Sequence, residues 1–500
     1  MNNTYPLKRI NLIFKILLLA PVIVALLAGC THVPRDGDFS EVERLVGERI
    51  PQKVHWYQGG EEDAQVKAAL DDLLKEPLTA TTAVQIALLN NRSLQSEYEN
   101  LGIAQADLVQ AGLLSNPVLF ASIRFPNGGD GSNNTEFNIA KEFLDVLLRP
   151  ARKRIAETEF ERAKLRVSNA VLDLAAEVQS AFYNVQGNHQ LVDIQNVATD
   201  AAQASYELAQ RFDEAGNISE LELAQERSAA ADMSAELLRA RANLLGSRDA
   251  LNRLLGLTGA GRHWSLGHRL PELPDSDPDQ EHVEEVALNQ RLDLAAAKKE
   301  ISQLSEALEI TRKYRWIGGA TFGVSTERDP GGGRVTGPNF SVEIPVFDQR
   351  QAEIARLESL LEQSKFRWAA LEVAIQNDVR AAVHRISAAR NLSEYYRDEL
   401  VPAREQVVKF TQQEQNYMLV DVFELLFARQ QEIQTYHGYI DSLAEYWIGR
   451  ADLARIIGVG LPEVGNMPIV KSKETQGHKA MEVNSKEHDA HSNHGDATHH

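Results

Sequence analysis

The sequence contains one cysteine, Cys30, in 500 residues. A lone cysteine cannot form a disulfide within the chain, and its usual alternative is a free thiol in the core. Proline and glycine are also scarce, with 17 and 31 residues that gather in a few short stretches. The long segments between these stretches favour helix, because both residues that interrupt helices are missing from them.

Basic residues are also fewer than acidic residues. The chain has 52 lysines and arginines against 71 aspartates and glutamates, a formal net charge of −19. This balance argues against a nucleic-acid partner, because phosphate binding needs basic patches. Apolar residues make up 43% of the chain, which is enough to build packed structure.

Long apolar runs are missing except near the N-terminus. A basic start is followed by an apolar run over residues 16–27 and then by Leu-Ala-Gly-Cys at 27–30. This ending is the bacterial lipobox pattern, in which small residues admit the peptidase and the cysteine thiol accepts a diacylglycerol. It predicts a signal peptide over residues 1–29 and an acyl anchor on Cys30. An uncleaved signal anchor is the alternative, but the run is short for a bilayer span. Thr31 follows the cysteine, as in lipoproteins that Gram-negative bacteria sort to the outer membrane.

Two stretches of the chain, 200 residues apart, share a two-part signature. The first reads Ala-Leu-Leu-Asn-Asn-Arg-Ser-Leu at 87–94, and the second reads Ala-Leu-Asn-Gln-Arg-Leu-Asp-Leu at 287–294. The second part repeats too, since Glu222-Leu223 is followed 202 residues later by Glu424-Leu425. A period this long indicates a duplicated half-domain and not a solenoid of small units.

Each copy contains two short segments in which apolar and polar residues alternate. The alternation predicts strands at about 117–125, 135–141, 319–326 and 338–346. A glycine-rich loop lies between the members of each pair, so each copy contains one hairpin.

Long helical segments surround the hairpins. Helix is predicted over residues 79–114, 148–212 and 349–415, and some sixty residues of helix would reach on the order of 95 Å. The residues at 216–219 and 417–421 end the two longest segments, and Ser219 is the predicted N-cap of the returning helix. The predicted organisation is a signal peptide (1–29), an N-terminal lipidated segment (30–77), a first repeat (78–269), a proline-rich linker (270–280), a second repeat (281–462) and a flexible His-rich tail (463–500).

The four strands have the length and alternation of outer-membrane strands. Four strands cannot close a barrel, and lipid does not tolerate an open sheet edge. The chain would therefore have to oligomerise, and two copies would supply eight strands and three would supply twelve. A soluble four-stranded sheet covered by helices is the alternative, which the lipobox disfavours.

This organisation resembles the TolC family of outer-membrane efflux proteins over residues 78–462. The resemblance rests on the paired Ala-x₂-Asn-x₃-Leu signatures, interpreted as helix starts, and on the order of two further motifs. These are Ile-Pro-Val-Phe-Asp at 344–348 and Glu-Leu-Leu-Phe-Ala-Arg-Gln at 424–430. It implies a mainly α fold with a small β part, in which a homotrimer forms one twelve-stranded outer-membrane β-barrel continued by a periplasmic α-helical barrel. A periplasmic adaptor protein would dock at the helical tip.

The resemblance also assigns the two helical turns. Family turns carry a glycine followed about six residues later by an acidic residue, and Gly216 and Glu222 match this pattern. In the second copy Met418 replaces the glycine, while Glu424 is retained. Threefold symmetry would arrange Glu222, Asp421 and Glu424 in rings at the entrance, which favour cations. Solvated charge on a helix face is the alternative for each of them.

Histidines concentrate in the last thirty residues, which hold 6 of the chain's 14. We expect weak binding of Cu, Zn, Ni or Co ions there, because imidazoles stand near carboxylates in a polar tract. The candidate ligands are His488, His491, His494, His499 and His500. A disordered, solubilising tail or an engineered end is the alternative, although the metal-exporting branch of the family favours metal binding.

Motifs of catalysis are missing. The glycines at 331–333 lack the lysine and helix that a phosphate loop requires, and His189, His384 and His437 stand singly in helical segments. We therefore expect no enzyme and no cofactor. The resemblance implies a passive exit duct, lipid-anchored in the outer membrane and extending into the periplasm. It would be coupled to an adaptor and an inner-membrane pump of the resistance-nodulation-division type, and would export metal ions or drugs. The alternatives are an exit duct for type I secretion and a non-pore structural lipoprotein that buffers metal.

Overall fold

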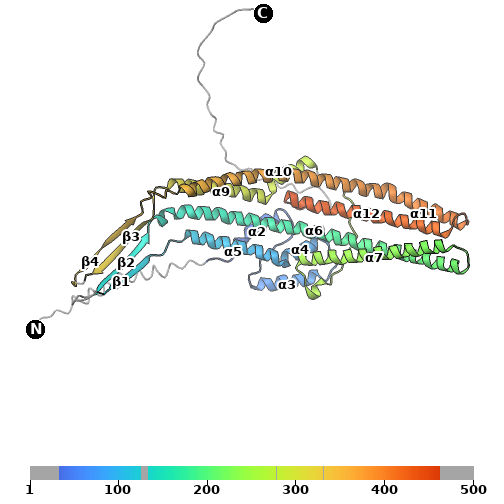
Figure 1. Cartoon of the computed structure of the whole chain (residues 1–500), viewed down its shortest axis with the longest axis horizontal. Coiled ribbons are helices and arrows are strands. Elements are labelled where there is room, and N and C mark those ends of the chain that lie inside the picture. The colour runs from blue at the N-terminus through green and yellow to red at the C-terminus, as the bar shows by residue number, and fades with distance from the viewer. Residues whose placement is uncertain (1–32, 126–132, 268, 278, 330, 462–500) are drawn as a thin grey trace, which may run out of the picture.

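The computed structural model describes residues 33–125, 133–267, 269–277, 279–329 and 331–461. They form an elongated molecule with a small sheet at one end and two helical turns at the other (Figure 1). Long helices connect the two ends, and a lobe from the N-terminal part of the chain lies against their middle (Figure 1).

The same order of helices and strands occurs twice along the chain, after a short N-terminal lobe. The N-terminal lobe contains α2 (Phe39–Gly47) and α3 (Glu61–Leu73). The first copy consists of α4 (Ala80–Asn90), α5 (Arg92–Gly112), β1 (Val118–Arg124), β2 (Asn134–Glu142), α6 (Leu144–Glu214) and α7 (Glu220–Leu255), followed by a short 3-10 turn (Gly259–Arg262). The second consists of α8 (Gln280–Gln290), α9 (Leu292–Lys313), β3 (Ala320–Arg328), β4 (Arg334–Val342), α10 (Gln351–Tyr395), a π-helical turn (Tyr396–Leu400), α11 (Val401–Asn416) and α12 (Val422–Ile457).

The first predicted helix, over 79–114, is in fact two helices. Asn91 separates α4 from α5 with an extended backbone (ψ 119°), and its side-chain oxygen accepts from the amide of Leu94 to cap α5. Arg291 interrupts the second copy in the same way (ψ 123°), 200 residues later. The repeated signatures therefore mark helix–helix junctions, and the predicted helix starts within them are those of α5 and α9. Asparagine favours such a cap because its short side chain satisfies free amides at a helix N-terminus.

The first long helix is longer than predicted, whereas the second is interrupted. Helix α6 contains 71 residues, which corresponds to about 105 Å. It includes Pro150 in its second turn, where the missing amide removes one intrahelical hydrogen bond to residue 146. In the second copy the predicted helix over 349–415 is divided by the π turn, and Pro402 lies just after that turn at the start of α11.

The four strands form one antiparallel sheet in the order β1-β2-β3-β4. The central pairing joins the two copies, because β2 pairs with β3 from Thr135 opposite Arg328 to Glu142 opposite Thr321. Strands β1 and β4 are thus the two edges of the sheet.

The fourth strand was predicted four residues too late, at 338–346 instead of Arg334–Val342. The hairpin turn is tighter than its composition indicates, since the amide of Asp329 bonds to the carbonyl of Gly333 and Arg334 already pairs with Arg328. At the other end pairing stops before Pro345, which has no amide to donate.

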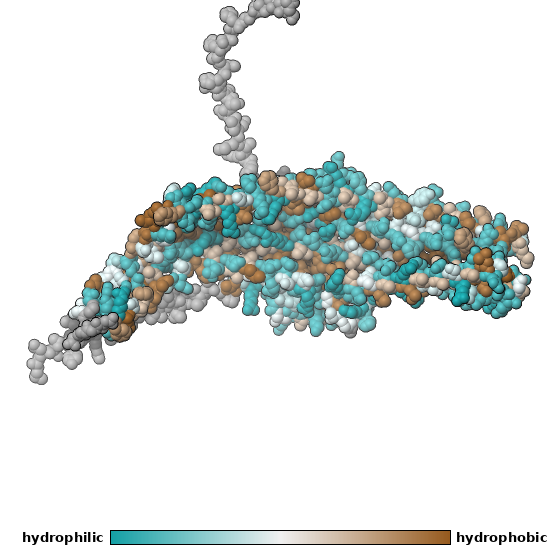
Figure 2. All heavy atoms as spheres, viewed as in Figure 1, coloured by the Kyte–Doolittle hydropathy of each residue, from teal (hydrophilic) through white to brown (hydrophobic). Residues whose placement is uncertain are grey.

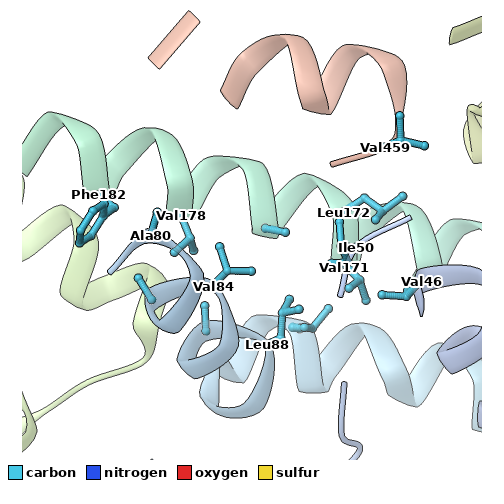
Figure 3. Close-up of a cluster of buried hydrophobic side chains, with 14 of the residues drawn as sticks. Val46, Ile50, Ala80, Val84, Leu88, Val171, Leu172, Val178, Phe182 and Val459 are labelled. Atoms are coloured by element: carbon cyan, nitrogen blue, oxygen red, sulfur yellow. The ribbon is translucent and has the colours of Figure 1, made fainter. Parts of the chain in front are cut away.

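The hydrophobic core lies in the middle of the molecule, where the N-terminal lobe meets the helices. Val171, Val178 and Phe182 of α6 face Val84 and Leu88 of α4 (Figure 3). Each of these five side chains is at most 3% exposed. This core fixes α4 on α6 and so sets the direction of α5 toward the sheet.

Polar contacts attach the lobe and the linker to the helices. The ammonium of Lys164 in α6 is buried and contacts the carboxylate of Asp38 at 2.7 Å. In the linker, Asp277 accepts from Arg390 at 2.7 Å and from the hydroxyl of Tyr446 at 2.6 Å. These contacts hold the segments outside the two copies against α6, α10 and α12.

Candidate functional site: the two-faced sheet and the helical tip

The register of the sheet sorts its side chains onto two faces. Residues that stand opposite each other on neighbouring strands point to the same side of a sheet. One row, Leu119, Ile139, Val324 and Pro338, crosses all four strands. We define the apolar face by Leu119, Ala121, Ile123, Phe137, Ile139, Phe322, Val324, Pro338, Phe340 and Val342, which the register places on one side.

The apolar face is uncovered in the single chain. Leu119 and Phe340 are 71% and 69% exposed, and Ile139 in the centre of the sheet is 50% exposed. Hydrophobic side chains are visible at this end of the molecule and again at its far tip (Figure 2). An apolar face of this extent, uncovered, is characteristic of contact with lipid or another chain.

The opposite side of the sheet is mainly polar. We define the polar face by Ser122, Arg124, Asn134, Glu136, Asn138, Glu142, Thr321, Ser325, Glu327, Asn339 and Ser341. Val118, Phe120 and Val335 share this side near the strand ends, and Lys141, Arg328 and Arg334 are the charged exceptions on the other face. The alternation noted in the sequence therefore produces an amphipathic sheet.

Hydrogen bonds between side chains order the polar face. The amide of Asn339 donates to Asn138 at 2.9 Å, crossing the intervening strand at Gly323. A Cβ on Gly323 would stand 2.5 Å from the side-chain oxygen of Asn339, so this crossing requires glycine. Near the loops Asn134 donates to Glu327 at 2.6 Å.

Two glutamates meet on the polar face where the sheet joins the helices. The carboxylate of Glu343 accepts from the amide of Gly319 at 3.1 Å, and that of Glu142 accepts from the adjacent Ala320 at 3.1 Å. The sequence alone does not reveal this pair, because the two residues are 201 positions apart and are brought together by the β2–β3 and β3–β4 pairings. Their equal placement at the ends of β2 and β4 was the available signal.

The other predicted site residues lie at the far end of the helices, in two turns of equal geometry. In the first tip turn (residues 215–219) Gly216 has φ +68°, and Asn217 donates to the carbonyl of Phe212 at 2.8 Å. In the second (residues 417–421) Met418 has φ +57°, and Leu419 donates to Glu414 at 3.0 Å. Both are left-handed helix ends of the Schellman type, so Met418 occupies the place of Gly216.

The acidic residues of the tip cap the returning helices. Ser219 and Glu222 form a reciprocal capping box, in which Glu222 accepts from the amide and the hydroxyl of Ser219 at 2.7 and 2.9 Å. These bonds lower the pKa of Glu222. Asp421 accepts from the amide of Glu424 at 2.8 Å and so caps α12. The prediction of Ser219 as an N-cap is confirmed.

Aromatic packing brings the two tip turns together. The rings of Phe212 in α6 and Phe423 in α12 lie 6.1 Å apart in an edge-to-face arrangement. The second turn also presents an apolar surface to solvent, with Tyr417, Met418 and Leu419 at 78, 93 and 73% exposure. The structure thus unites the predicted tip residues at one end of the molecule, remote from the sheet (Figure 1).

Comparison with known proteins agrees with this geometry. The family model described as "Outer membrane efflux protein" matches residues 83–257. The cobalt-zinc-cadmium resistance protein CzcC of Cupriavidus metallidurans is 23% identical over 390 residues, which cover 76% of this chain and 90% of CzcC. The chain is therefore similar to outer membrane efflux proteins, through residues 83–257 for the family model and over 390 residues for CzcC.

Solved structures share the fold of this chain. The outer membrane channel CmeC of Campylobacter jejuni matches with a TM-score of 0.66 at 15% identity, covering 76% of this chain and 85% of CmeC. The outer membrane protein VceC of Vibrio cholerae matches with a TM-score of 0.62 at 16% identity, covering 79% and 97%. The predicted resemblance and the mainly helical fold with a small sheet are confirmed. These solved structures show the fold that the chain shares with outer-membrane channel proteins.

Several predictions from the sequence lie outside the described residues. They concern the lipidation site Cys30 and the metal ligands His488, His491, His494, His499 and His500. Within the described part of the chain, no group of three or more histidine, cysteine or acidic side chains could hold a metal ion. The helices of that part include none with both the length and the hydropathy to cross a membrane.

Proposed function

We propose that three copies of the chain form a lipid-anchored channel in the outer membrane, the passive exit duct of a tripartite efflux system. The observation that carries this proposal is the amphipathic sheet with two open edges at the end of long helical hairpins. Three such sheets would supply twelve strands, with the apolar face toward lipid and the polar face toward the lumen.

The free edge of β4 is compatible with pairing to a neighbouring copy. The β3–β4 hydrogen bonds include those from Glu343 to Gly319 and from Asp329 to Gly333, so odd-numbered residues of β4 donate toward β3. Pro338 therefore has its nitrogen on the open side, and the β3–β4 ladder loses no bond to it. If β1 of a neighbouring copy paired with this edge, the pairing would lack one backbone donor, at Pro338.

The tip is the proposed meeting point with a periplasmic adaptor. The family works with an adaptor and an inner-membrane pump of the resistance-nodulation-division type. Support for this role in the present chain comes from Tyr417, Met418 and Leu419, an exposed apolar surface beside capped helix starts. Such a surface suits contact with another protein.

Metal ions are the proposed cargo. The relative CzcC is named a cobalt-zinc-cadmium resistance protein. The polar face supports a cation path, because Glu136, Glu142 and Glu327 outnumber Arg124 there. We further propose that Cys30 carries the lipid anchor and that the histidines of the tail bind Cu, Zn, Ni or Co ions weakly.

Single-channel conductance of the purified chain in planar bilayers, together with its oligomer mass in detergent, tests the proposal. We expect a trimer with discrete openings that favour cations, and a lower cation preference in a Glu136→Gln/Glu327→Gln variant. Ser325→Gln, on the same face, is the matched control and should leave ion preference unchanged. A monomer without conductance at any voltage would overturn the duct and leave a structural, metal-buffering lipoprotein.

A further inference from the structure

A wide groove opens in the N-terminal lobe between α3, α4 and the segment 53–55. Its volume is about 860 Å³. The floor is apolar, and acidic side chains stand along α3. The floor is formed by Val54, Val66, Ala69, Leu73 and Leu89, and the acidic side chains are Glu62 and Asp72 of α3 and Glu76, which follows the helix. Lys53 is the basic side chain of the lining, at the end where the segment 53–55 enters.

Helix α3 is only lightly packed on the rest of the molecule. Leu70 is its sole buried residue among the 13, while Val66 and Leu73 remain half-buried beside the groove. A helix of this length gains most of its stability from burying an apolar face. An apolar occupant of the groove would complete the packing of α3.

The last described residues of the chain lie against the N-terminal lobe, which contains the groove. The amide of Gly460 donates to the carbonyl of Arg49 at 3.0 Å, so the end of α12 is fixed to the N-terminal lobe. From Arg49 the chain needs four residues, at most about 14 Å, to reach Lys53 at the groove. The six residues after Leu461 span up to about 20 Å, which brings residue 467 within reach of it.

The sequence beyond Leu461 complements the groove. Residues 467–470 read Met-Pro-Ile-Val, and Lys471 and Lys473 follow. The apolar run matches the floor, and the two lysines match the acidic side chains of α3. The histidines of the tail begin only at residue 478, beyond this run.

We propose that residues 467–473 of the same chain dock in the groove, with Met467, Ile469 and Val470 on its floor and the two lysines beside Glu62 and Glu76. The proposal is independent of the channel function, because it rests on the lobe and on the order of residues after α12. Docking fixes the origin of the histidine tail at the level of the lobe.

Cross-linking of the full-length chain in detergent tests the proposal. Ala69→Cys on the floor is paired with Ile469→Cys and treated with a short reagent that bridges two thiols. The matched control pairs Ile469→Cys with Ala64→Cys, which lies on α3 outside the groove lining. The variant with Ile469→Cys alone controls for the natural Cys30.

We expect at least a fivefold higher yield of monomeric, internally bridged chain from the groove pair than from the control pair. The variant Glu62→Lys/Glu76→Lys should reduce that yield, and adding Lys471→Glu/Lys473→Glu should restore it. This rescue separates loss of docking from loss of folding. Equal yields from both pairs, or a product of dimer mass that shows the tail of a second copy in the groove, would overturn the proposal.

Hydrogen exchange gives a second readout without substitutions. Amides of residues 469–473 should exchange at least tenfold more slowly than those of residues 490–500 in the same chain. Equal exchange in the two segments would contradict docking.

Discussion

The side-chain amide of Asn91 donates to the main-chain carbonyl of Leu254 over 2.8 Å, joining the junction of α4 and α5 to the end of α7. In the second copy the guanidinium of Arg291 makes the corresponding bond to Ile456, at the end of α12, over 3.0 Å. Each repeated signature thus satisfies a carbonyl that the last turn of a helix leaves free. The duplication preserves this contact although the residue that makes it has changed.

Replacing Asn91 by alanine should therefore destabilise the first copy. The change removes the cap of α5 and the bond to Leu254 from a side chain that is 7% exposed. We expect a loss of about 1–3 kcal/mol, measured as unfolding monitored by circular dichroism in detergent. Asn100→Ala, exposed on the same helix, is the control and should change stability little. Equal effects of the two substitutions would contradict the role of the junction.

A positive charge on the apolar face should prevent membrane assembly. Val324→Lys places a charge among Ile139 and Pro338, at a cost of about 2–4 kcal/mol per chain in the bilayer centre. Ser325→Lys, one residue on and on the opposite face, should be tolerated. The measurement is the amount of folded oligomer recovered from outer-membrane fractions. Equal recovery of both variants would show that the sheet has no lipid side.

Substitutions at the equivalent positions Gly216 and Met418 of the two tip turns should change stability in opposite directions. Gly216→Ala should destabilise by about 1 kcal/mol, because a left-handed backbone is strained for any residue with a Cβ. Met418→Gly should stabilise by a similar amount, because Met418 has φ +57°. Thermal unfolding of both variants tests this, with Leu419→Ala as a control for loss of an exposed apolar side chain. Shifts of the same sign would be inconsistent with a shared turn geometry.

His437 should make stability depend on pH near neutrality. Its pKa is raised by Asp441, whose carboxylate lies 3.0 Å from the ring on the same helix, and by Glu236 on α7. Glu236 and His437 line a cavity of about 230 Å³ with Gln195, Met233 and Gln434. Because the folded pKa is raised, the contribution is complete below about pH 6.5 and is lost as the pH rises through the folded pKa.

The contribution of His437 is measured from the melting temperatures of the natural chain and of Asp441→Asn, compared between about pH 5.5 and 8.5. The difference should be largest at the acidic end and shrink toward the alkaline end. Asp193→Asn, a substitution on α6, serves as the control and should leave the His437 contribution in place. A constant difference across the range would rule out the titration of His437 as its cause.

Local patterns in the sequence predicted the local structure well. Alternation located the first three strands to within two residues at their ends, and the Ser219–Glu222 spacing is that of the capping box observed. The break at Asn91 was missed because its cause is a contact with Leu254, 163 residues away. Apolar periodicity continues through Asn91 and carries no trace of that contact.

Which side chains share a surface was harder to predict from the sequence than where the helices and strands lie. Which residues share a face of the sheet follows from pairing between β2 and β3, and the sequence does not specify that register directly. Glu142 and Glu343 were missed for this reason. At the tip, the residue types predicted the turns, while the position of Phe212 against Phe423 depends on how the long helices lie beside one another.

The π turn at Tyr396–Leu400 accommodates about one of the two residues by which the second copy is longer than the first. The ends of β2 and β4, Glu142 and Val342, are 200 residues apart, whereas Gly216 and Met418 are 202 apart. The additional residues thus entered between the second hairpin and its tip. A π turn holds about one residue more than an α turn, so it absorbs an insertion without rotating the helix beyond it. The second copy thus carries an extra residue within a continuous helical rod, and its tip turn keeps the left-handed geometry of the first, as Gly216 and Met418 show.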